Sequence, residues 1–506
     1  MKFYKPKTGL IIEDLFIIVL NVIIVLGLFP LTSRTPFQKY LIPAIIFVIS
    51  WVLTSYLFGR YGRLKTQSFY QAAFKLFYTS VINFSLFAGF IILQHASPFS
   101  QYVLFAIMAG IFITEYLMLF LYFALRYATR YDLPVTSEVI TRENAVLVPS
   151  PPLTAIEEED RIENILNFTD TRTLDFLKSD AKLLASSTKV LYNLNHDFLN
   201  EIPHYKYDTF IEAEKLNHLR GINKMFFYIN EKLPDHGKVV VRYISKSTIK
   251  KNIYRKYPFI IRDLVYIASF IFHRVFAKFF LTQRAYLDIT RGKKRILSKT
   301  EVLGRLVCCG FDIEKECKRG GINVVVAKRV KQPEVFTSRR SYGPLIKLKR
   351  FGKNKNPFFV YKFRTMHPYA EFLQSYIFDH YNLQSGGKFN RDIRVTTLGK
   401  FMRKYWLDEL PMLLNLLKGE VKLIGVRPLS EQYFNLYSSQ LQEKRLRFKP
   451  GLLPPFYADM PKTLDEIQAS EMKYLNQCEE KGIFITDTKY FFLILKNIFI
   501  KKVRSA

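Results

Sequence analysis

Four long apolar runs, separated by short polar stretches, occupy the first part of the chain. They cover residues 15–31, 41–58, 76–93 and 102–125. Each approaches the roughly 20 residues that a helix needs to cross the hydrocarbon core of a bilayer. The pattern predicts a four-helix transmembrane region over residues 1–130, with the role of a membrane anchor.

Lys and Arg residues gather on one side of these runs. They stand before the first run, between the second and third, and after the fourth, whereas Arg34 and Lys39 lie between the first and second. By the positive-inside rule, the N-terminus and everything after residue 130 face the cytoplasm. Glu115 is the notable acidic residue of the runs, and we expect no buried ion pair among them.

Short β-rich runs and helical stretches alternate over residues 131–335. Residues 238–244 and 323–328 have the composition of buried strands, and 212–232 predicts a helix. Two consecutive prolines mark 146–152 as a linker. Residues 216–244 faintly resemble the late part of a methyltransferase-like domain, but no G-x-G loop precedes them. We predict a cytoplasmic α/β domain with a degenerate Rossmann-like fold and a regulatory or spacer role.

One segment of this middle domain, 258–281, is strongly apolar but carries cations throughout. Its longest uncharged stretch, 264–272, is too short to span a membrane. An interfacial or re-entrant membrane helix and a buried core helix both fit this pattern. The basic, aromatic tail at 489–502 leaves a similar choice between packing on its own domain and lying on the bilayer.

The last part of the chain, 336–506, changes pattern again. Alternation over 345–365 predicts a hairpin that turns at 352–356. Further on, the pair Asp408-Glu409 stands between two clusters of Lys and Arg. The apolar positions 410, 413, 414 and 417 recur at helical spacing, which predicts a helix with a buried apolar face. An acidic pair in basic surroundings suits phosphate-ester chemistry with a divalent cation, although Asp-Glu pairs commonly just cap helices.

Several ordered motifs surround the acidic pair, from about residue 342 to about 451. They are 343–353, 361–366, 392–396, 398–400, 407–411, Asn415, 417–419 and 427–428. In these motifs the chain resembles the bacterial sugar transferase family, the monotopic phosphoglycosyl transferases that load a polyprenyl phosphate carrier. The N-terminal apolar runs correspond to a long form with a four-helix membrane region. The resemblance implies a small α+β catalytic domain at 336–506 with membrane-interface helices.

The resemblance also implies an activity. Such enzymes transfer a sugar 1-phosphate from a nucleotide diphosphate sugar, commonly a UDP-sugar, to undecaprenyl phosphate, which initiates exopolysaccharide, capsule, O-antigen or glycan assembly. Asp408 would be the nucleophile that forms an aspartyl-phosphosugar intermediate. Glu409 would bind Mg²⁺. The protein would then be a multi-pass protein of the bacterial inner (cytoplasmic) membrane with a cytoplasmic catalytic domain.

Cationic residues around the pair would hold the phosphates. We assign Arg403 to the lipid phosphate, and Lys362, Arg364 and Arg427 to the donor diphosphate. An ion pair between Asp392 and Arg394 is either structural or catalytic.

Two departures from the family pattern put the identity of the sugar in doubt. Val426 stands where family members often have proline, and 452–457 replaces a Gly-Trp pair.

The composition of the chain limits the classes of molecule that it is expected to bind. The chain has 75 Lys and Arg against 43 Asp and Glu, a net charge of +32, and 46 Phe and 31 Tyr. Such a balance suits membrane lipids and phosphorylated substrates; nucleic acid is not expected, because no recognition motif accompanies the charge. A homodimer is left open, and the scattered cysteines do not predict a zinc site. The main rival is a catalytically silent membrane scaffold for polysaccharide assembly, which has no chemical need for the Asp408-Glu409 pair.

Overall fold

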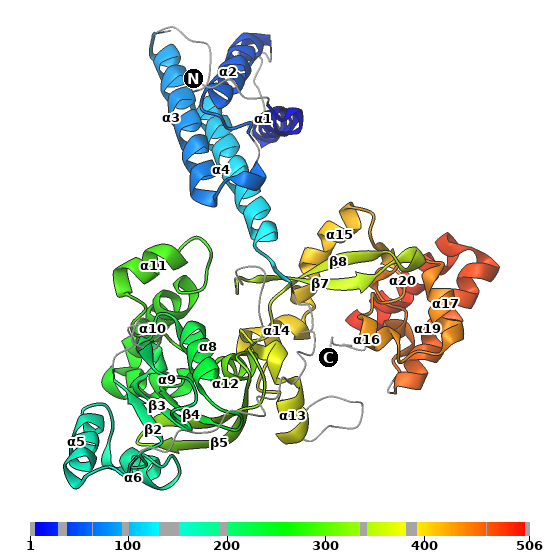
Figure 1. Cartoon of the computed structure of the whole chain (residues 1–506). Coiled ribbons are helices and arrows are strands. Elements are labelled where there is room, and N and C mark those ends of the chain that lie inside the picture. Colours follow the sequence, from blue (N-terminus) through cyan, green and yellow to red (C-terminus); the bar gives the residue numbers. More distant parts are fainter. Residues whose placement is uncertain are drawn as a thin grey trace. The chain divides into compact units, whose positions relative to one another are not determined.

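The computed structural model describes residues 6–28, 38–62, 64–93, 101–130, 151–192, 201–333, 342–380, 392–461 and 463–500 (Figure 1). The chain forms two compact units, Met1–Tyr127 and Ala128–Ala506. Residues 146–150 of the predicted linker lie outside the described residues, and the predicted boundary at 335/336 stays a prediction.

The first unit consists of four long helices, at the positions of the four apolar runs. They are α1 (Thr8–Leu28), α2 (Gln38–Leu57), α3 (Phe69–Leu93) and α4 (Gln101–Arg126), with the short turn η1 (Leu64–Thr66) between α2 and α3. Among the described residues, Thr8–Leu28 and Phe105–Arg126 are long and apolar enough to cross a membrane, by length and composition. That all four helices span the bilayer stays a prediction.

A buried charge cluster links these helices, contrary to our expectation. Arg60 lies 2.7 Å from an oxygen of Asp14 and 2.5 Å from one of Glu115, and both carboxylates are buried. Trp51 Nε1 and Tyr61 Oη also donate to Asp14, each at 3.0 Å. A buried carboxylate is costly unless paired, so Arg60 compensates for both acids. Asp14 and Glu115 lie 46 and 55 residues from Arg60 in the sequence, so the helical spacing of apolar residues did not predict the cluster.

A five-stranded mixed sheet forms the centre of the middle region. Its order is β2 (Thr188–Leu191), β3 (Thr209–Lys215), β4 (Lys238–Tyr243), β6 (Ile322–Arg329) and β5 (Phe311–Arg319). The first three strands are parallel, and β6 pairs antiparallel with both β4 and β5. The two strands predicted from sequence are confirmed. The helix predicted over 212–232 is wrong in its first part, because β3 buries Phe210, Ile211 and Ala213 and α8 (Ile222–Lys232) begins only afterwards.

Helices cover both faces of this sheet, which explains the uninterrupted valine runs. Val239 and Val241 of β4 pack in a core with α8 and α12 (Lys299–Cys308). Val240, between them, packs in a second core with α5 (Ala155–Leu166) and α6 (Thr171–Ser179). Figure 1 shows the two helix pairs on opposite sides of the sheet. Strands buried on both faces are apolar at every position. The region is therefore α/β, and its relation to Rossmann-like folds stays a prediction.

The apolar-basic segment forms α10 (Phe259–Phe270) and a π-helix, η3 (Ile271–Phe276), between α9 (Lys246–Lys256) and α11 (Gln283–Thr290). No residue of α10 is buried; Phe259, Ile260 and Leu264 are 74, 89 and 69% exposed. The buried-core interpretation of 258–281 is therefore wrong. The segment presents an unusually apolar surface, as an interfacial helix requires.

The C-terminal region begins with the predicted hairpin, β7 (Leu345–Phe351) and β8 (Pro357–Phe363), with the turn η4 (Lys353–Lys355). The short strand β1 (Thr129–Arg130) pairs parallel with β7. The remaining elements are η5 (Ala370–Leu373), α13 (Gln374–His380), α14 (Thr397–Lys404), η6 (Leu407–Met412), α15 (Leu413–Leu417), β9 (Lys422–Ile424), α16 (Glu431–Phe434), α17 (Ser439–Leu446), β10 (Gly451–Leu453), α18 (Phe456–Asp459), α19 (Leu464–Lys481) and α20 (Ile483–Phe499). β9 and β10 form a parallel pair. The region thus mixes helices and strands, as an α+β domain does.

The basic, aromatic tail lies mostly within α20. One face of this helix packs on its own region through Tyr490 and Ile494, which are buried in a core shared with α17 and α19. Phe484 and Phe492 are exposed. The packing alternative is thus confirmed for one face, and contact of the other face with a bilayer stays open. Residues 501–502 lie outside the described residues.

Candidate active site

The acidic pair lies in a tight turn rather than in a regular helix. Asp408 and Glu409 belong to the 3₁₀-helix η6, which follows Trp406 in a left-handed conformation (φ 54°) and contains Pro411. The helix α15 continues from it, so the pair does open a helical stretch. Trp406 Nε1 donates to Tyr457 Oη at 3.0 Å and ties the turn to α18.

The leucines after the pair were expected to be buried, and this prediction is wrong. Leu410, Leu413 and Leu417 are 50, 45 and 84% exposed. The buried residue is Asn415, whose side chain donates to Phe359 O at 2.7 Å and accepts from Tyr361 N at 3.1 Å. These bonds fix the polar side of α15 against β8, so the leucine side faces outward.

Asp408 is buried at 8% exposure, and its Oδ1 has no hydrogen-bond partner among the described residues. Burial raises the pKa of this carboxyl group, and the charge of Glu409 adds to the rise, while the cations Lys362 and Arg403 oppose it. An unsatisfied buried oxygen is uncommon in folded proteins. It leaves Asp408 with an acceptor available for chemistry.

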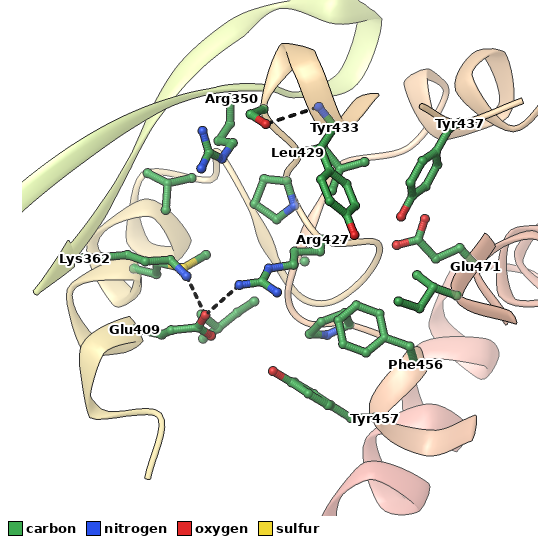
Figure 2. Close-up of a pocket in the computed structure, with 18 residues that line it drawn as sticks. Arg350, Lys362, Glu409, Arg427, Leu429, Tyr433, Tyr437, Phe456, Tyr457 and Glu471 are labelled. Atoms are coloured by element: carbon green, nitrogen blue, oxygen red, sulfur yellow. Dashed lines mark hydrogen bonds and ion pairs between the residues drawn. The ribbon is translucent and has the colours of Figure 1, made fainter. Parts of the chain in front are cut away.

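Glu409, in contrast, has two cationic partners. Lys362 Nζ on β8 lies 2.5 Å from Glu409 Oε1, and Arg427 Nη2 lies 3.6 Å from the same oxygen. Figure 2 shows both cations directed at this carboxylate. Burial, and then the charge of Arg427, lower the pKa of Lys362. The charge of Lys362 also opposes the rise in the pKa of Asp408, so Lys362 interacts with both acids.

A cavity of about 290 Å³ opens beside this cluster. Lys362, Glu409 and Arg427 line it, together with Arg350, which the sequence reasoning missed. Burial, and then repulsion by Arg427, lower the pKa of Arg350 to about 10. Strand register could have found Arg350: it pairs with Phe358, and alternation places Phe358 on the same face of β8 as Lys362.

The other end of the cavity is aromatic. Its lining includes Tyr433, Tyr437, Phe456 and Tyr457, and Figure 2 shows them on the far side of Arg427 from Lys362. The departure at 452–457, noted from sequence, supplies part of this wall.

Glu471 also lines the aromatic end and is fully buried. It pairs with Arg445, yet its Oε1 has no hydrogen-bond partner among the described residues. Burial raises the pKa of Glu471 despite the opposing charge of Arg445. No sequence signal joins Glu471 to the acidic pair, because it lies 62 positions after Glu409 in the chain.

The other predicted residues, Asp408, Arg364 and Arg403, lie outside the lining of the cavity, with Asp408 directly beside the lining residue Glu409. Arg364 Nε donates to Gly343 O at 2.9 Å, and its guanidinium lies over the Tyr342 ring at 5.1 Å. Arg403 Nε donates to Thr365 Oγ1 at 3.0 Å, and its charge acts on Asp408. The structure thus brings Lys362, Glu409 and Arg427 together in the cavity.

Asp392 and Arg394 form the predicted ion pair. Arg394 Nη2 lies 2.8 Å from Asp392 Oδ2, and the side chain of Arg394 is buried. This geometry supports the structural role of the pair.

Magnesium fits the acidic pair chemically. Mg²⁺ usually keeps several waters and binds one or two carboxylates plus substrate phosphates, so it needs no dedicated cage. Among the described residues there is no cluster of three or more His, Cys, Asp or Glu with metal-binding geometry. Glu409 is the carboxylate of the pair that lines the cavity, so it is the residue that would hold such an ion.

Comparisons with known proteins agree with the motifs. Residues 333–501 match the family described as bacterial sugar transferase. Galactosyl transferase CpsE of Streptococcus agalactiae serotype III is 36% identical over 168 residues, 32% of this chain and 36% of that protein. The UDP-N-acetylgalactosamine-undecaprenyl-phosphate N-acetylgalactosaminephosphotransferase of Aeromonas hydrophila is 36% identical over 123 residues, 23% of this chain and 26% of that protein.

A third relative has a different named donor. The UDP-glucose:undecaprenyl-phosphate glucose-1-phosphate transferase of Klebsiella pneumoniae is 36% identical over 115 residues, 22% of this chain and 23% of that protein. The matched stretch spans 36 to 48% of the length of the first relatives. The likeness therefore concerns the C-terminal region.

Proposed function

We propose that this chain, whose residues 333–501 belong to the bacterial sugar transferase family, transfers a sugar 1-phosphate from a nucleoside diphosphate sugar to undecaprenyl phosphate. One observation carries the proposal: Arg350, Lys362 and Arg427 converge on one cavity, where the charge of Arg427 lowers the pKa of both other cations. Repulsion of this kind is relieved when a polyanion binds between the cations. A diphosphate is such an anion.

The donor is proposed to be a UDP-sugar. Relatives from Aeromonas and Klebsiella carry UDP-sugars in their names. The cavity has a cationic end for the diphosphate and an aromatic end for a ring bearing hydrogen-bond donors. Glu471 Oε1, which has no hydrogen-bond partner among the described residues, lies at the aromatic end. Aromatic faces and carboxylates are common partners of sugars and bases.

In the first step, an oxygen of Asp408 attacks the phosphorus that carries the sugar. The Asp408 O–P bond forms, the P–O bond to the nucleoside monophosphate breaks, and that monophosphate leaves with the electron pair. Lys362, Arg427 and Arg350 hold the diphosphate and offset the charge on the departing phosphate. The buried, incompletely partnered carboxylate of Asp408 loses little solvation when it attacks.

In the second step, an oxygen of undecaprenyl phosphate attacks the same phosphorus. The bond to Asp408 breaks, the carboxylate is regenerated, and the product is a lipid diphosphate sugar. We assign Arg403 to the lipid phosphate, because its charge acts on Asp408 while it lies outside the lining of the donor cavity.

Magnesium is proposed as the cofactor, held by Glu409 with Asp408 beside it. When bound, it would supply charge neutralisation of the diphosphate. Lys362 and Arg427 position the Glu409 carboxylate for that role through their contacts at 2.5 and 3.6 Å.

The exposed apolar face near the acidic pair suits a lipid substrate. Leu398 and Phe401 of α14 are 66 and 52% exposed, and Leu410, Leu413 and Leu417 of η6 and α15 are exposed as well. A polyprenyl phosphate keeps its tail in the bilayer, so Asp408 must work close to the headgroup layer. We propose that this face meets the cytoplasmic leaflet of a bacterial inner membrane in a multi-pass protein.

The proposal is tested with the purified full-length chain in detergent. A panel of UDP-sugars is supplied with undecaprenyl phosphate and Mg²⁺, and UMP release is measured. We expect release with at least one donor, dependence on both substrates, and loss in EDTA that Mg²⁺ restores. No release with any donor would favour the silent scaffold, and full activity in EDTA would remove the metal role of Glu409.

A further inference from the structure

A second polar cavity, of about 280 Å³, lies apart from the active-site cavity and shares no lining residue with it. Its wall is strongly basic: Arg220, Lys278, Arg295 and Arg305 all line it. Other lining residues come from η3 and from the C-terminal region, including Tyr342 and Tyr369. The cavity therefore lies where the apolar-basic segment meets the C-terminal region.

The cations around this cavity outnumber the nearby acids, which are Asp288, 3.8 Å from Arg220, and Glu301. Glu301, fully buried on α12, pairs with Lys278, with Arg274 at 3.3 Å and with Arg305 at 3.1 Å. Burial alone would raise the pKa of Glu301, but these cations hold it well below its usual range. The single carboxylate of Glu301 is thus shared by three cations, and Arg295 is a fourth cation beside them.

Arg295 forms no ion pair with an acid among the described residues, although the charge of Glu301 acts on it. Its Nε and Nη2 atoms are buried and lack hydrogen-bond partners among the described residues. Burial, and then repulsion by Arg305, lower the pKa of Arg295 to about 10. The main chain of this residue is tied firmly, because Arg295 N donates to Asn217 O at 2.8 Å and Arg295 O accepts from Asn217 Nδ2 at 2.7 Å. Two donor atoms of a firmly positioned guanidinium thus lie buried at this cavity without an acceptor among the described residues.

Arg305 also has one buried donor atom without a hydrogen-bond acceptor among the described residues. Its Nη1 reaches Asn223 at 2.5 Å and its Nη2 reaches Glu301, but its Nε is also buried without a partner among the described residues. Unsatisfied donors in a basic cavity point to a ligand with several acceptor oxygens.

We infer that this cavity is a second anion site that binds a phosphate group through Arg295, with Arg220 at its rim. A phosphate offers acceptor oxygens that match the planar fork of a guanidinium, and its charge offsets the surplus of cations. The inference goes beyond the proposed transfer reaction and does not depend on it.

Two sources of such a phosphate are distinguished by the surroundings of the cavity. His273, Ala277 and Lys278 line it from the apolar-basic segment, while Ile271, Val275 and Phe276 of the same segment are exposed. A phospholipid would satisfy both features, with its headgroup in the cavity and its tails beside η3. A soluble phosphate or diphosphate would use the cavity alone.

The test uses the full-length chain in nanodiscs of neutral phosphatidylcholine and its Arg295→Gln and Arg220→Gln variants. Arg284→Gln is the matched control, because Arg284 is exposed on α11 next to Gln283 of the lining but does not line the cavity itself. Inorganic pyrophosphate binding is measured by calorimetry with and without saturating UDP, which is added to compete for the active-site cavity, and the Arg295→Gln variant reports the second cavity in both conditions. A second arm replaces part of the lipid with phosphatidylglycerol and measures the midpoint of thermal unfolding.

We expect wild type to bind pyrophosphate or to be stabilised by phosphatidylglycerol, and we expect Arg284→Gln to show the same effect with the same magnitude. Arg295→Gln should weaken that effect at least about tenfold, because a charge-assisted two-bond contact is lost, and Arg220→Gln should weaken it by about threefold. Without the anion, Arg295→Gln should unfold at the same or a higher temperature than wild type.

The two arms identify the source: an effect of pyrophosphate points to a soluble anion, and an effect of phosphatidylglycerol alone points to a lipid headgroup. Absence of both effects in wild type would overturn the inference. So would equal losses in Arg284→Gln and Arg295→Gln, which would mean a diffuse surface charge. If Arg295→Gln does not fold, an unchanged affinity in Arg220→Gln together with unchanged binding in Arg295→Lys counts against the site.

Discussion

Asp408 and Glu409 are adjacent carboxylates in different electrostatic surroundings. Glu409 is neutralised by Lys362 and Arg427, whereas Asp408 is buried with one oxygen free of partners among the described residues. Environments that separate two acids in this way commonly separate their roles. The arrangement supports one residue that attacks and one that holds a cation.

The raised pKa of Asp408 predicts how a substitution changes stability with pH. A carboxyl group whose folded pKa lies above its unfolded value stabilises the fold fully below the unfolded pKa, and this contribution is lost as pH rises through the folded pKa. Asp408→Asn should therefore raise the midpoint of thermal unfolding at neutral pH, and the gain should vanish as pH falls toward about 4.

Thermal melts of the full-length chain between pH 4 and 8 check this prediction. Glu480→Gln, at an exposed position of α19, is the control and should change the midpoint little at any pH. A destabilised Asp408→Asn protein at neutral pH would mean that the carboxylate is favourably paired in the fold.

Arg403 should separate the two half-reactions. Arg403→Ala should raise the apparent KM for undecaprenyl phosphate by about tenfold or more, because a charge-assisted contact to phosphate is lost. The adduct with the donor sugar phosphate should still form. Steady-state UMP release against lipid concentration measures the first effect, with the exposed neighbour Lys404→Ala as control. Loss of the adduct in Arg403→Ala would place this residue in the donor half-reaction instead.

At the residue level, sequence motifs predicted which side chains carry charge near the acidic pair but not which of them share a cavity. Lys362 and Arg427 line the same cavity, whereas Arg364 donates a hydrogen bond to the carbonyl oxygen of Gly343. Arg350 and Glu471 were missed for different reasons. Arg350 required strand register, and Glu471 required the packing of α19 against the cavity, which no local pattern encodes.

At the level of elements, apolar periodicity predicted the helices but gave the wrong environment for some of their faces. Leu410, Leu413 and Leu417 recur at helical spacing, yet they face outward because Asn415 satisfies two backbone groups of β8. Helical periodicity shows that a face is apolar and does not show what covers it. In a membrane-associated protein, lipid can take the place of a protein core.

The exposed face of α10 and η3 predicts membrane attachment of the second compact unit. A chain shortened to residues 128–506 should sediment with vesicles that contain phosphatidylglycerol. Ile267→Glu with Ile271→Glu should release most of it, since both side chains are exposed, at 52 and 42%, and acids are repelled from an anionic, apolar interface.

Ile156→Glu with Leu166→Glu is the matched control. These two residues are exposed on α5, at 74 and 39%, and lie in the same compact unit. The control pair should remain with the vesicles. Equal release of both double variants, or a soluble unmodified protein, would show that α10 and η3 do not hold this unit on the membrane.

At the scale of the whole molecule, composition and apolar runs predicted the N-terminal helices and the mixed C-terminal part. They did not reveal how closely the middle and C-terminal regions pack. Gly304 of α12 lies so near the loop before η5 that an added Cβ would stand 2.2 Å from Tyr369 O. Such contact between segments 65 residues apart in sequence depends on backbone shape, which motif spacing does not encode.

Membrane topology tests the arrangement of the N-terminal helices. Reporter fusions after residues 35 and 97 should be external, and fusions after residues 65 and 135 should be cytoplasmic, because the cations stand on one side of the runs. Paired alkaline phosphatase and green fluorescent protein fusions report the two sides. A cytoplasmic signal at residue 97 would contradict four spans and leave α1 and α4 as the spanning helices.

The covalent intermediate is the central claim, and mass spectrometry of the intact protein tests it most directly. The full-length chain is incubated with an active UDP-sugar and Mg²⁺ but without undecaprenyl phosphate, then quenched and weighed. The account predicts a mass increase equal to one sugar phosphate, located on Asp408 by peptide mapping, discharged by added undecaprenyl phosphate and absent in Asp408→Asn. UMP release that requires both substrates with no adduct at any time, or an adduct that persists in Asp408→Asn, would contradict it.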